Sequence, residues 1–556
     1  MKPLLRQLFA RPLFALELLL LSLFISILAL GSSIYTIQVL NRYLSHGLNA
    51  TLITLTVGVI IVIAMEFLFR QVRLKLAQGV TVPPSAKLAQ GTFALMTQAM
   101  ASSILAMNPI RRREVLQAPT IVERNYAAPT LVAMLDAPFA LLFIGVLFLL
   151  QPQLGWITAS FIALAVLLTI IGNALLTRPT QHTMFTASQA GALAQAAMWR
   201  PESLRAFNAR NHYNQRWQQY HGEATQAGRR VAALKEMLLT ATQSLAALMS
   251  VSVIAAGAML VMEGKLDVGM MIGANILAAR AMAPMARLSQ LVGPMVETKR
   301  ATESLNSFGQ IPQEPQKQET LSSFSGQIAL EELGFSHAGA PTPLFESLSL
   351  NLPPGGTLVV CGANGCGKTT LAKLLMGLHS PSRGQIKLDG APLEALSLTW
   401  WRSQVAYVPQ NPEFLDGTLL ENLTLLNPEL QRDQLEQLIQ QSGLGPYINS
   451  QPDGLESMVH NGGENLSFGI RKRLAIARAL TSACRLAILD DPMEGMDNQG
   501  RTTMSSVITT LTRSGRSVIL FTEDDQLIHG ADLVLNLDSK PVPTLTQCTQ
   551  RGEAPQ

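Results

Sequence analysis

Six long apolar stretches in the first half of the chain constrain its fold more than any other feature. A helix needs roughly 20 mostly apolar residues to cross a bilayer. The stretches that reach this length are residues 13–36, 51–69, 131–150, 154–176, 237–262 and 267–286. The last one is interrupted by Gly269, Gly273, Arg280 and Pro284. We expect its cytoplasmic end to face protein or water. The sequence therefore predicts an all-α six-helix transmembrane domain over residues 1–306.

Basic residues gather in the two long segments between these stretches, while the other, short loops carry little more than Arg42 and Lys265. The first segment holds Arg70, Arg73, Lys75, Lys87, Arg111, Arg112, Arg113 and Arg124. The second holds Arg178, Arg200, Arg205, Arg210, Arg216, Arg229, Arg230 and Lys235. Positive charge marks cytoplasmic loops, so both segments and both termini are predicted to be cytoplasmic. Both segments lack strand alternation, which favours helices that extend the spans.

Composition agrees with a membrane protein and excludes other classes. Only 14% of residues are charged, against roughly 25% in soluble proteins. The net charge of +4 is modest, and basic residues of a membrane protein usually mark its cytoplasmic loops, so no nucleic-acid partner is predicted. The apolar stretch after Lys2, Arg6 and Arg11 is too long for a signal peptide and is interpreted as an uncleaved first span.

Cysteine usage predicts neither a disulfide framework nor a metal site. The cysteines are Cys361, Cys366, Cys484 and Cys548. They form no CxxC pair and no cluster with histidine, so we interpret them as reduced thiols.

The second half of the chain has the composition of a soluble α/β domain. Residues 307–325 are rich in Pro, Gln, Ser and Glu and are predicted to be a linker. Short β-prone runs then alternate with helical stretches over residues 326–540. Examples of these runs are 358–361, 406–408, 486–489 and 517–521. Residues 541–556 are polar and are predicted to form a disordered tail.

A glycine-rich segment at 362–369 predicts a phosphate-binding loop. It reads Gly-Ala-Asn-Gly-Cys-Gly-Lys-Thr and stands between a β-prone run and a helical stretch. Glycines let backbone N–H groups surround phosphate oxygens, and the following helix adds its positive end. The predicted ATP-binding residues are Gly362, Ala363, Asn364, Gly365, Cys366, Gly367, Lys368, Thr369 and Thr370. Lys368 is assigned to the β- and γ-phosphates and Thr369 to Mg²⁺.

A second motif supplies a carboxylate for the same metal ion. The apolar run 486–489 is followed directly by Asp490, which in a P-loop fold holds the Mg²⁺ shell. Together, the two motifs predict an ATP- and Mg²⁺-binding P-loop NTPase domain.

Further segments resemble the ATP-binding-cassette (ABC) transporter family. Leu466-Ser-Phe-Gly-Ile470 followed by Arg471-Lys-Arg resembles the family's signature segment, usually LSGGQ. Tyr407-Val-Pro-Gln410 resembles the glutamine loop, and Glu494-Gly-Met-Asp497 resembles the D-loop. The resemblance implies that Gln410 contributes to the metal site and to catalysis, and that Ser467 and Gly469 approach the γ-phosphate. It also implies a dimer, with ATP held between the P-loop of one subunit and the signature of the other.

Two membrane segments resemble type I secretion exporters of Gram-negative bacteria. These are Met134-Leu-Asp136-Ala-Pro138-Phe and the stretch from Gly273 through Arg280 to Pro284. The resemblance implies a multi-pass protein of the bacterial inner membrane that exports protein cargo with a membrane-fusion protein and an outer-membrane channel. Asp136 is interpreted here as a helix cap at the membrane surface, and the roles of Asp136 and Arg280 stay open.

The sequence departs from the family at catalytic positions. Asp491 stands where the family has a glutamate that polarises the attacking water, and Glu523 stands where it has a switch histidine. His337 occupies the place of an adenine-stacking aromatic residue. A misplaced general base can forfeit much of a roughly 10²–10⁴-fold rate contribution. These changes predict a transport ATPase that binds Mg-ATP but hydrolyses it poorly, paired with a catalytically complete second half-transporter.

Three hypotheses of function stay open at this point. The first is a type I protein-secretion subunit, and the second is a heterodimeric exporter of small molecules, lipids or peptides. The third is a regulatory subunit that binds ATP without turnover. Tolerated substitutions in a slow but competent ATPase are the alternative to impaired hydrolysis. The sequence does not name the cargo or decide between a homodimer and a heterodimer.

Overall fold

The computed structural model describes residues 12–44, 49–337, 339–482 and 484–547, apart from the side chains of 82–85 and 292. The chain divides into two compact units. The helical unit comprises residues up to 98 and 106–311, and the α/β unit comprises residues 99–105 and 312 onwards. Lys2, Arg6, Arg11 and Cys548 lie outside the described residues.

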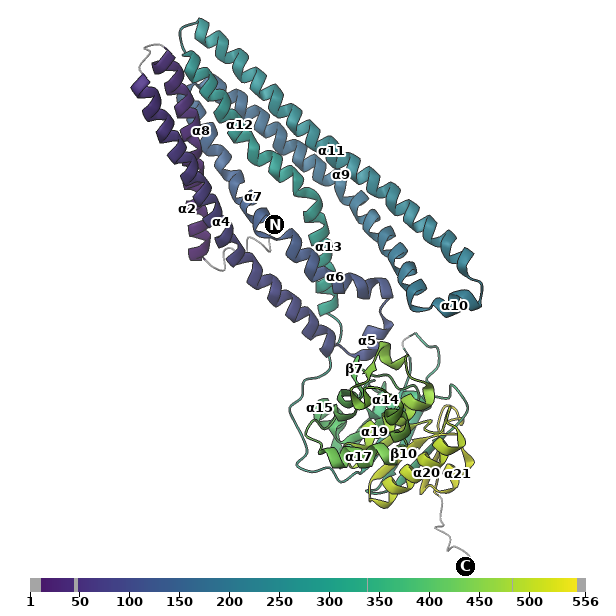
Figure 1. The fold of residues 1–556 in the computed structure, drawn as a ribbon. Helices are drawn as coiled ribbons and strands as arrows, with labels where there is room; N and C mark the ends of the chain where they lie inside the picture. The colour runs from purple at the N-terminus through teal and green to yellow at the C-terminus, as the bar shows by residue number, and fades with distance from the viewer. Residues whose placement is uncertain (1–11, 45–48, 338, 483, 548–556) are drawn as a thin grey trace, which may run out of the picture. The chain divides into compact units, whose positions relative to one another are not determined.

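Long helices make up the helical unit (Figure 1). Its principal helices are α2 (Pro12–Gln38), α4 (Asn49–Gln98), α6 (Pro109–Asn125), α7 (Ala128–Asp136), α8 (Ala140–Leu150), α9 (Pro152–Trp199), α11 (Arg210–Met262), α12 (Val268–Gln290) and α13 (Val292–Gly309). A π-helical turn, Val39–Tyr43, continues α2, and a 3₁₀ turn, Ala137–Phe139, joins α7 to α8. The short α10 (Pro201–Ala206) connects α9 to α11, and α5 (Ala101–Ala106) lies between α4 and α6 in the sequence.

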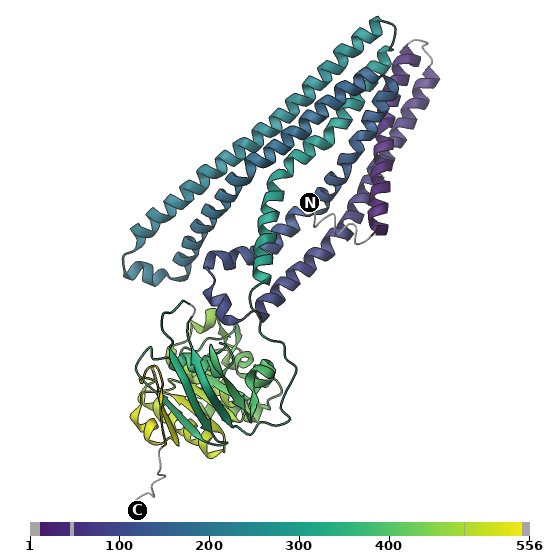
Figure 2. The ribbon, with the colours of Figure 1, turned by 180° about the vertical axis from the view of Figure 1, so that it is seen from behind.

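Six helices among the described residues are long and apolar enough to cross a membrane. They are Pro12–Tyr43, Asn49–Gln98, Ala128–Leu150, Pro152–Trp199, Arg210–Met262 and Val268–Gln290. Five of them contain a predicted stretch in full, and the last begins one residue after the predicted start at 267, so the prediction of six apolar helices is confirmed. The long helices α4, α9 and α11 continue well beyond their apolar stretches, as expected for helices that extend into water (Figures 1 and 2).

Small residues let the last span pack closely against the first. A side chain at Gly269 would meet Asn41 Oδ1 at 2.2 Å, and one at Gly273 would meet Ile37 Cγ1 at 2.4 Å. The two glycines therefore let α12 approach α2 and its π-helical continuation closely, which is a common way to pack helices in membranes. Half of the most apolar window of α12 is buried within the protein.

The α/β unit is built on a mostly parallel sheet. Its six strands follow the order β12-β11-β3-β10-β9-β6. They are β3 (Thr357–Cys361), β6 (Val405–Val408), β9 (Leu486–Asp490), β10 (Ser517–Phe521), β11 (Leu533–Asn536) and β12 (Thr544–Gln547). All neighbours pair in parallel except β12, which is antiparallel to β11. The central strands are buried on both faces, which explains their continuous apolar sequence.

An antiparallel sheet and several helices complete this unit, and Figure 2 shows the strands side by side. The sheet has the order β2-β1-β4-β5. Its strands are β1 (Ile328–Phe335), β2 (Phe345–Leu352), β4 (Arg383–Leu388) and β5 (Ala391–Pro392). A two-stranded ribbon pairs β7 (Gly417–Thr418) with β8 (Met458–Val459). The helices are α14 (Lys368–Leu375), α15 (Leu398–Ser403), α16 (Leu419–Thr424), α17 (Arg432–Gln441), α18 (Gly445–Ser450), α19 (Phe468–Leu480), α20 (Asn498–Arg513) and α21 (Asp525–His529).

The C-terminal segment corrects one prediction. Residues 541–547 were expected to be disordered, but Thr544–Gln547 form β12 and pair with Leu533–Asn536. The polar composition that suggested disorder is compatible with an edge strand, because its side chains are exposed while its backbone completes the ladder. Residues 548–556 lie outside the described part of the chain.

Candidate nucleotide-binding and hydrolysis site

Parallel pairing brings the predicted site residues to one edge of the sheet. The loop 362–367 follows β3, Asp490 ends β9, and Glu523 lies two residues beyond β10. Because β10 pairs with both β3 and β9, the carboxyl ends of these three strands lie side by side. Such an edge is where open parallel sheets bind ligands.

The backbone of the loop has the conformation that the glycines predict. Gly362, Gly365 and Gly367 have positive φ angles of 141°, 86° and 117°. A side chain at Gly367 would also meet Leu344 Cδ2 at 2.8 Å. The Ala363 amide donates to Asp538 Oδ1 at 2.8 Å, which fixes the start of the loop. The turn then delivers Lys368 and Thr369 at the N-terminus of α14, where helix and backbone dipoles favour phosphate.

Lys368 is paired with the residue that departs most from the family. Its Nζ donates to Glu523 Oε1 at 2.7 Å and to the Gly362 carbonyl. The lysine side chain is only 6% exposed, whereas that of Glu523 is 53% exposed. Burial lowers the pKa of Lys368, but the Glu523 hydrogen bond and the charge of Asp491 outweigh it and raise the pKa overall. Glu523 thus contacts the lysine assigned to the β- and γ-phosphates.

The predicted metal residues lie close together. Thr369 Oγ1 donates to Gln410 Oε1 at 3.4 Å, and Gln410 Nε2 donates to Glu494 Oε2 at 3.0 Å. Asp490 is fully buried, and burial raises the pKa of its carboxyl group. Thr369 opposes this shift, yet neither carboxylate oxygen has a partner with hydrogen-bond geometry among the described residues.

This arrangement fits a magnesium ion. A buried carboxylate without a partner is costly, and a hard cation would compensate it. The donor set is a hydroxyl, an amide oxygen and a carboxylate, which are oxygen ligands of the kind Mg²⁺ takes. When bound, the ion would neutralise developing charge on the phosphates. The assignment of Thr369, Gln410 and Asp490 to it stays a prediction.

Asp491 has the surroundings of a tuned general base. Its backbone has a φ of 43°, and its amide donates to the Phe521 carbonyl at 2.9 Å. Burial, followed by the charge of Asp490, raises the pKa of Asp491 to about 6, while Lys368 opposes the shift. A carboxylate with this pKa is ionised at neutral pH and can accept a proton from water.

The raised pKa predicts a pH dependence of any hydrolysis at this site. Because only the ionised form of Asp491 accepts a proton, kcat/KM for Mg-ATP should fall about tenfold per pH unit below 6. Above that pH the profile should level off. The measurement is steady-state turnover of the purified full-length chain between pH 5 and pH 8, with Asp491→Asn as the control for the titration of ATP itself. A limb that persists in the Asn variant would contradict the assignment.

A buried lysine that was not predicted as a site residue donates hydrogen bonds to the backbone at this edge of the sheet. Lys472 Nζ donates to the carbonyls of Pro409, Asp490 and Asp491, at 3.3, 3.3 and 2.9 Å. The side chain is fully buried, and burial lowers its pKa to about 8. Lys472 therefore connects α19 to the backbone of the glutamine loop and to the end of β9. Its helical spacing from the buried residues Ile476 and Ala479 could have identified it.

The signature segment begins α19. Ser467 is the N-cap of this helix, and its hydroxyl accepts from the Ile470 amide at 3.3 Å. The Phe468 ring lies against Gly495 of the D-loop, where a side chain would meet it at 2.4 Å. Among the described contacts, none joins Ser467 or Gly469 to Lys368 or Thr369. The role of Ser467 and Gly469 toward the γ-phosphate stays a prediction.

His337 lies beyond β1 and is exposed. Its ring contacts Phe335 edge to face, with ring centroids 5.0 Å apart. The Phe335 centroid in turn lies 5.6 Å from that of His379. No described contact joins His337 to the loop 362–370, so its role toward adenine stays a prediction.

Two residues near the C-terminus contribute to the loop without having been predicted. Asp538 accepts from the Ala363 amide, and Lys540 Nζ donates to the Cys366 carbonyl at 2.8 Å. They follow β11, which is the neighbour of β3. The Cys366 thiol is buried, and burial raises its pKa, which agrees with its interpretation as a small loop residue.

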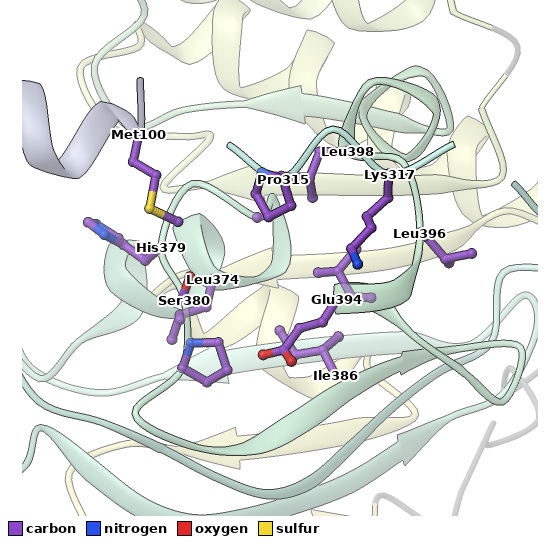
Figure 3. A pocket seen from close by; sticks show the side chains of 13 residues that line it. Met100, Pro315, Lys317, Leu374, His379, Ser380, Ile386, Glu394, Leu396 and Leu398 are labelled. Atoms are coloured by element: carbon purple, nitrogen blue, oxygen red, sulfur yellow. The ribbon is translucent and has the colours of Figure 1, made fainter. Parts of the chain in front are cut away.

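A separate cavity of about 330 Å³ lies elsewhere in the α/β unit (Figure 3). Met100 reaches it from the 99–105 segment, and Pro315 and Lys317 from the stretch after α13. Its walls include Leu374 and Leu398. Among the described residues, none that lines it belongs to the loop 362–370 or is Asp490, Asp491 or Glu523. It is therefore distinct from the nucleotide site.

Comparisons with known proteins place both halves of the chain in related families. The family description "ABC transporter transmembrane region" matches residues 124–285, and "ABC transporter" matches residues 345–494. The second match ends at Glu494 and so contains the P-loop, the glutamine loop, the signature segment and Asp491.

The most similar curated relatives include several translocation proteins. The leukotoxin translocation ATP-binding protein LktB of Pasteurella haemolytica-like sp. (strain 5943B) is 25% identical over 529 residues, covering 94% of this chain and 74% of the relative. The alpha-hemolysin translocation ATP-binding protein HlyB of Escherichia coli O157:H7 is 25% identical over 533 residues, with the same coverage. The type I secretion system ATP-binding protein PrsD of Rhizobium meliloti (strain 1021) is 28% identical over 421 residues, covering 73% of this chain and 70% of the relative.

A solved structure supports the fold. A bacterial Atm1-family ABC exporter with ATP bound superposes with a TM-score of 0.82 at 18% sequence identity. The similarity covers 94% of this chain and 93% of that one. It extends through the apolar helices and the α/β unit alike.

Proposed function

Because this chain belongs to the ABC transporter family and carries a transmembrane region and an ATPase domain in one polypeptide, we propose that it exports protein cargo as the ABC subunit of a type I secretion system. The observation that carries the proposal is that one chain contains both six apolar helices and the nucleotide site formed by Lys368, Thr369 and Asp490. Protein cargo is supported by the relatives LktB and HlyB, which are named for the translocation of leukotoxin and alpha-hemolysin. The type I secretion system is supported by PrsD, which is named for it. Such a subunit would lie in the inner membrane of a bacterium, with its ATPase domain in the cytoplasm.

The residues of the site suggest how ATP is handled. The amides of the loop and Lys368 bind the β- and γ-phosphates, while Thr369, Gln410 and Asp490 hold the metal ion. Asp491 accepts a proton from the attacking water. Ser467 and Gly469 cover the nucleotide of a second half-transporter, so this chain works as a dimer. A membrane-fusion protein and an outer-membrane channel would complete the export path.

We further propose that this chain is the poorly hydrolysing member of an asymmetric pair. The side chain of Asp491 is one methylene shorter than the glutamate of the family, and an anion, Glu523, holds Lys368. Two identical copies would contain two such sites and no complete one. A partner with intact residues would supply the turnover.

A second candidate keeps the same architecture and differs in cargo. A heterodimeric exporter of small molecules, lipids or peptides would also need six spans and one ATPase domain per chain. The regulatory alternative, in which ATP binding holds the dimer closed without turnover, is favoured by the Lys368–Glu523 pair. Drug- or lipid-stimulated turnover would support the heterodimeric exporter, and transport that survives Lys368→Ala would support the regulatory subunit.

The central test is Mg-ATP binding by the purified full-length chain. Lys368→Ala should weaken binding at least about tenfold, because it removes the buried cation that meets the phosphates. Lys373→Ala, farther along the same helix and only partly buried, is the matched control and should change binding little. In cells, Lys368→Ala should abolish appearance of the cargo in the medium. A chain without magnesium-dependent ATP affinity would rule out export powered from this subunit.

A further inference from the structure

Charged side chains form a cluster within the helical unit. It comprises Glu66, Arg70, Arg73, Asp136, Arg280 and Arg287. Arg73 pairs with Asp136 at 2.5 Å, and Arg287 pairs with the same carboxylate at 3.2 Å. Glu66 pairs with Arg70 at 2.5 Å and with Arg280 at 3.8 Å. Each carboxylate is thus shared by two arginines.

This geometry corrects the interpretation of Asp136 as a helix cap. Its side chain makes no capping hydrogen bond to the turn that follows it. Instead it accepts from Arg73, which is only 3% exposed and also donates to Ser22 Oγ at 3.1 Å. The capping interpretation was wrong because the partner, Arg73, is distant in sequence and belongs to a different helix.

The cluster reaches into the apolar part of the unit. Arg280 lies twelve residues after the start of α12, which corresponds to about 18 Å along the helix axis. A hydrocarbon core is about 30 Å thick, so this arginine lies well inside the length of the span. Charges at such depth are costly and generally mark a functional path. Besides its ion pair with Glu66, Arg280 donates to Ser32 Oγ at 3.0 Å.

A small cavity of about 100 Å³ adjoins these charges. Arg70, Asp136, Arg280 and Arg287 line it. Apolar side chains, including Phe139, Phe143 and Pro284, form the rest of the wall. The side chains of Arg280 and Arg287 are 32% and 49% exposed, so they have unused hydrogen-bonding capacity.

The charges of the cluster do not balance. Four arginines face two carboxylates, which leaves two positive charges uncompensated within the cluster. In addition, Arg73 Nε is buried without an acceptor among the described residues. An added anion would therefore be stabilised here, whereas an added cation would be repelled.

We propose that this cavity receives the carboxylate of an acidic side chain of the transported polypeptide. The guanidinium groups of Arg280 and Arg287 bind a carboxylate oxygen pair, as arginine does elsewhere in proteins. The volume corresponds to about three water molecules, which suits a carboxylate and its neighbouring methylene groups. This inference rests on the proposed function, because it deepens the identity of the cargo.

The test measures binding of a defined peptide in the absence of nucleotide. The full-length chain is placed in nanodiscs of phosphatidylcholine, and an uncharged dye reports the anisotropy of a peptide with six consecutive glutamates. Arg280→Gln should weaken binding about tenfold to a hundredfold, the range expected for losing a charged hydrogen bond. Arg280→Lys should retain part of the affinity. A peptide with glutamines in place of the glutamates should not bind.

Matched variants show whether the loss of peptide binding belongs to Arg280 itself. Arg229→Gln, on the exposed surface of α11, should leave peptide affinity unchanged. Arg280→Gln should retain wild-type Mg-ATP affinity, which shows that the protein is folded. Equal binding of the peptide by wild type and Arg280→Gln would overturn the proposal. So would Arg280-dependent binding of phosphatidylglycerol in place of the peptide, since the cluster would then hold a lipid. Peptide binding without ATP affinity would instead refute the proposed function alone.

Discussion

Replacing Glu523 by glutamine is expected to tighten Mg-ATP binding by about tenfold. Glu523 Oε1 lies 2.7 Å from Lys368 Nζ, so a nucleotide must separate this pair before its γ-phosphate can meet the lysine. The carboxylate also repels the triphosphate, and glutamine removes this repulsion with little change in shape. Because 53% of the Glu523 side chain is exposed, solvent weakens this repulsion. We therefore expect the binding free energy of Mg-ATP to improve by about 1.4 kcal/mol. Isothermal titration of the full-length chain measures the change.

Two control variants make this result specific. Asp525→Asn removes a nearby negative charge that has no described contact with Lys368, and it should change the affinity much less. Glu523→Gln combined with Lys368→Ala should lose the gain, because the benefit depends on the released lysine. Unchanged affinity in Glu523→Gln would mean that the pair offers no resistance to ATP.

The double substitution Asp491→Glu with Glu523→His is expected to raise ATP turnover at least about 10²-fold. The longer glutamate brings the general base to the position used by the family, and a positioned base typically contributes about 10²–10⁴-fold. Histidine replaces an anion by a potential donor to the γ-phosphate. Each single variant should give only part of the gain, since both groups act on the same transition state. Phosphate release by the purified chain, without a partner, is the measurement.

The background variants decide what a gain in turnover means. Lys368→Ala in the double variant should return the rate to the baseline, which excludes a contaminating ATPase. Brisk hydrolysis by the wild-type chain alone would contradict the proposal of a poorly hydrolysing subunit. The same protein mixed with a complete half-transporter should hydrolyse ATP well without any substitution.

The membrane half shows which features a sequence can predict. Hydrophobic length alone determines whether a helix can span, so all six apolar helices were predictable. The role of Gly269 and Gly273 was not, because their low hydropathy gave no sign of the close approach to Ile37 and Asn41. The Arg73–Asp136 ion pair could not be predicted either, because it joins helices that are far apart in the sequence.

In the ATPase half, too, local motifs were predictable from the sequence and contacts between distant residues were not. The loop 362–369 and Asp490 were predictable because local motifs define them, and parallel strands bring such motifs to one edge. The ion pair between Lys368 and Glu523 was not, because a sequence gives the types of two residues but not the rotamers that join them. The order of Thr544–Gln547 was missed because strand pairing depends on the partner β11 rather than on composition.

Lys472 links three parts of the ATPase domain: the glutamine loop, the end of β9 and the helix that begins with the signature segment. Its ammonium group donates hydrogen bonds to the carbonyl of Pro409, just before Gln410, and to the carbonyls of Asp490 and Asp491. The helix that carries Lys472 is capped by Ser467. A displacement of the glutamine loop would therefore strain the hydrogen bonds that join it to the helix carrying the signature.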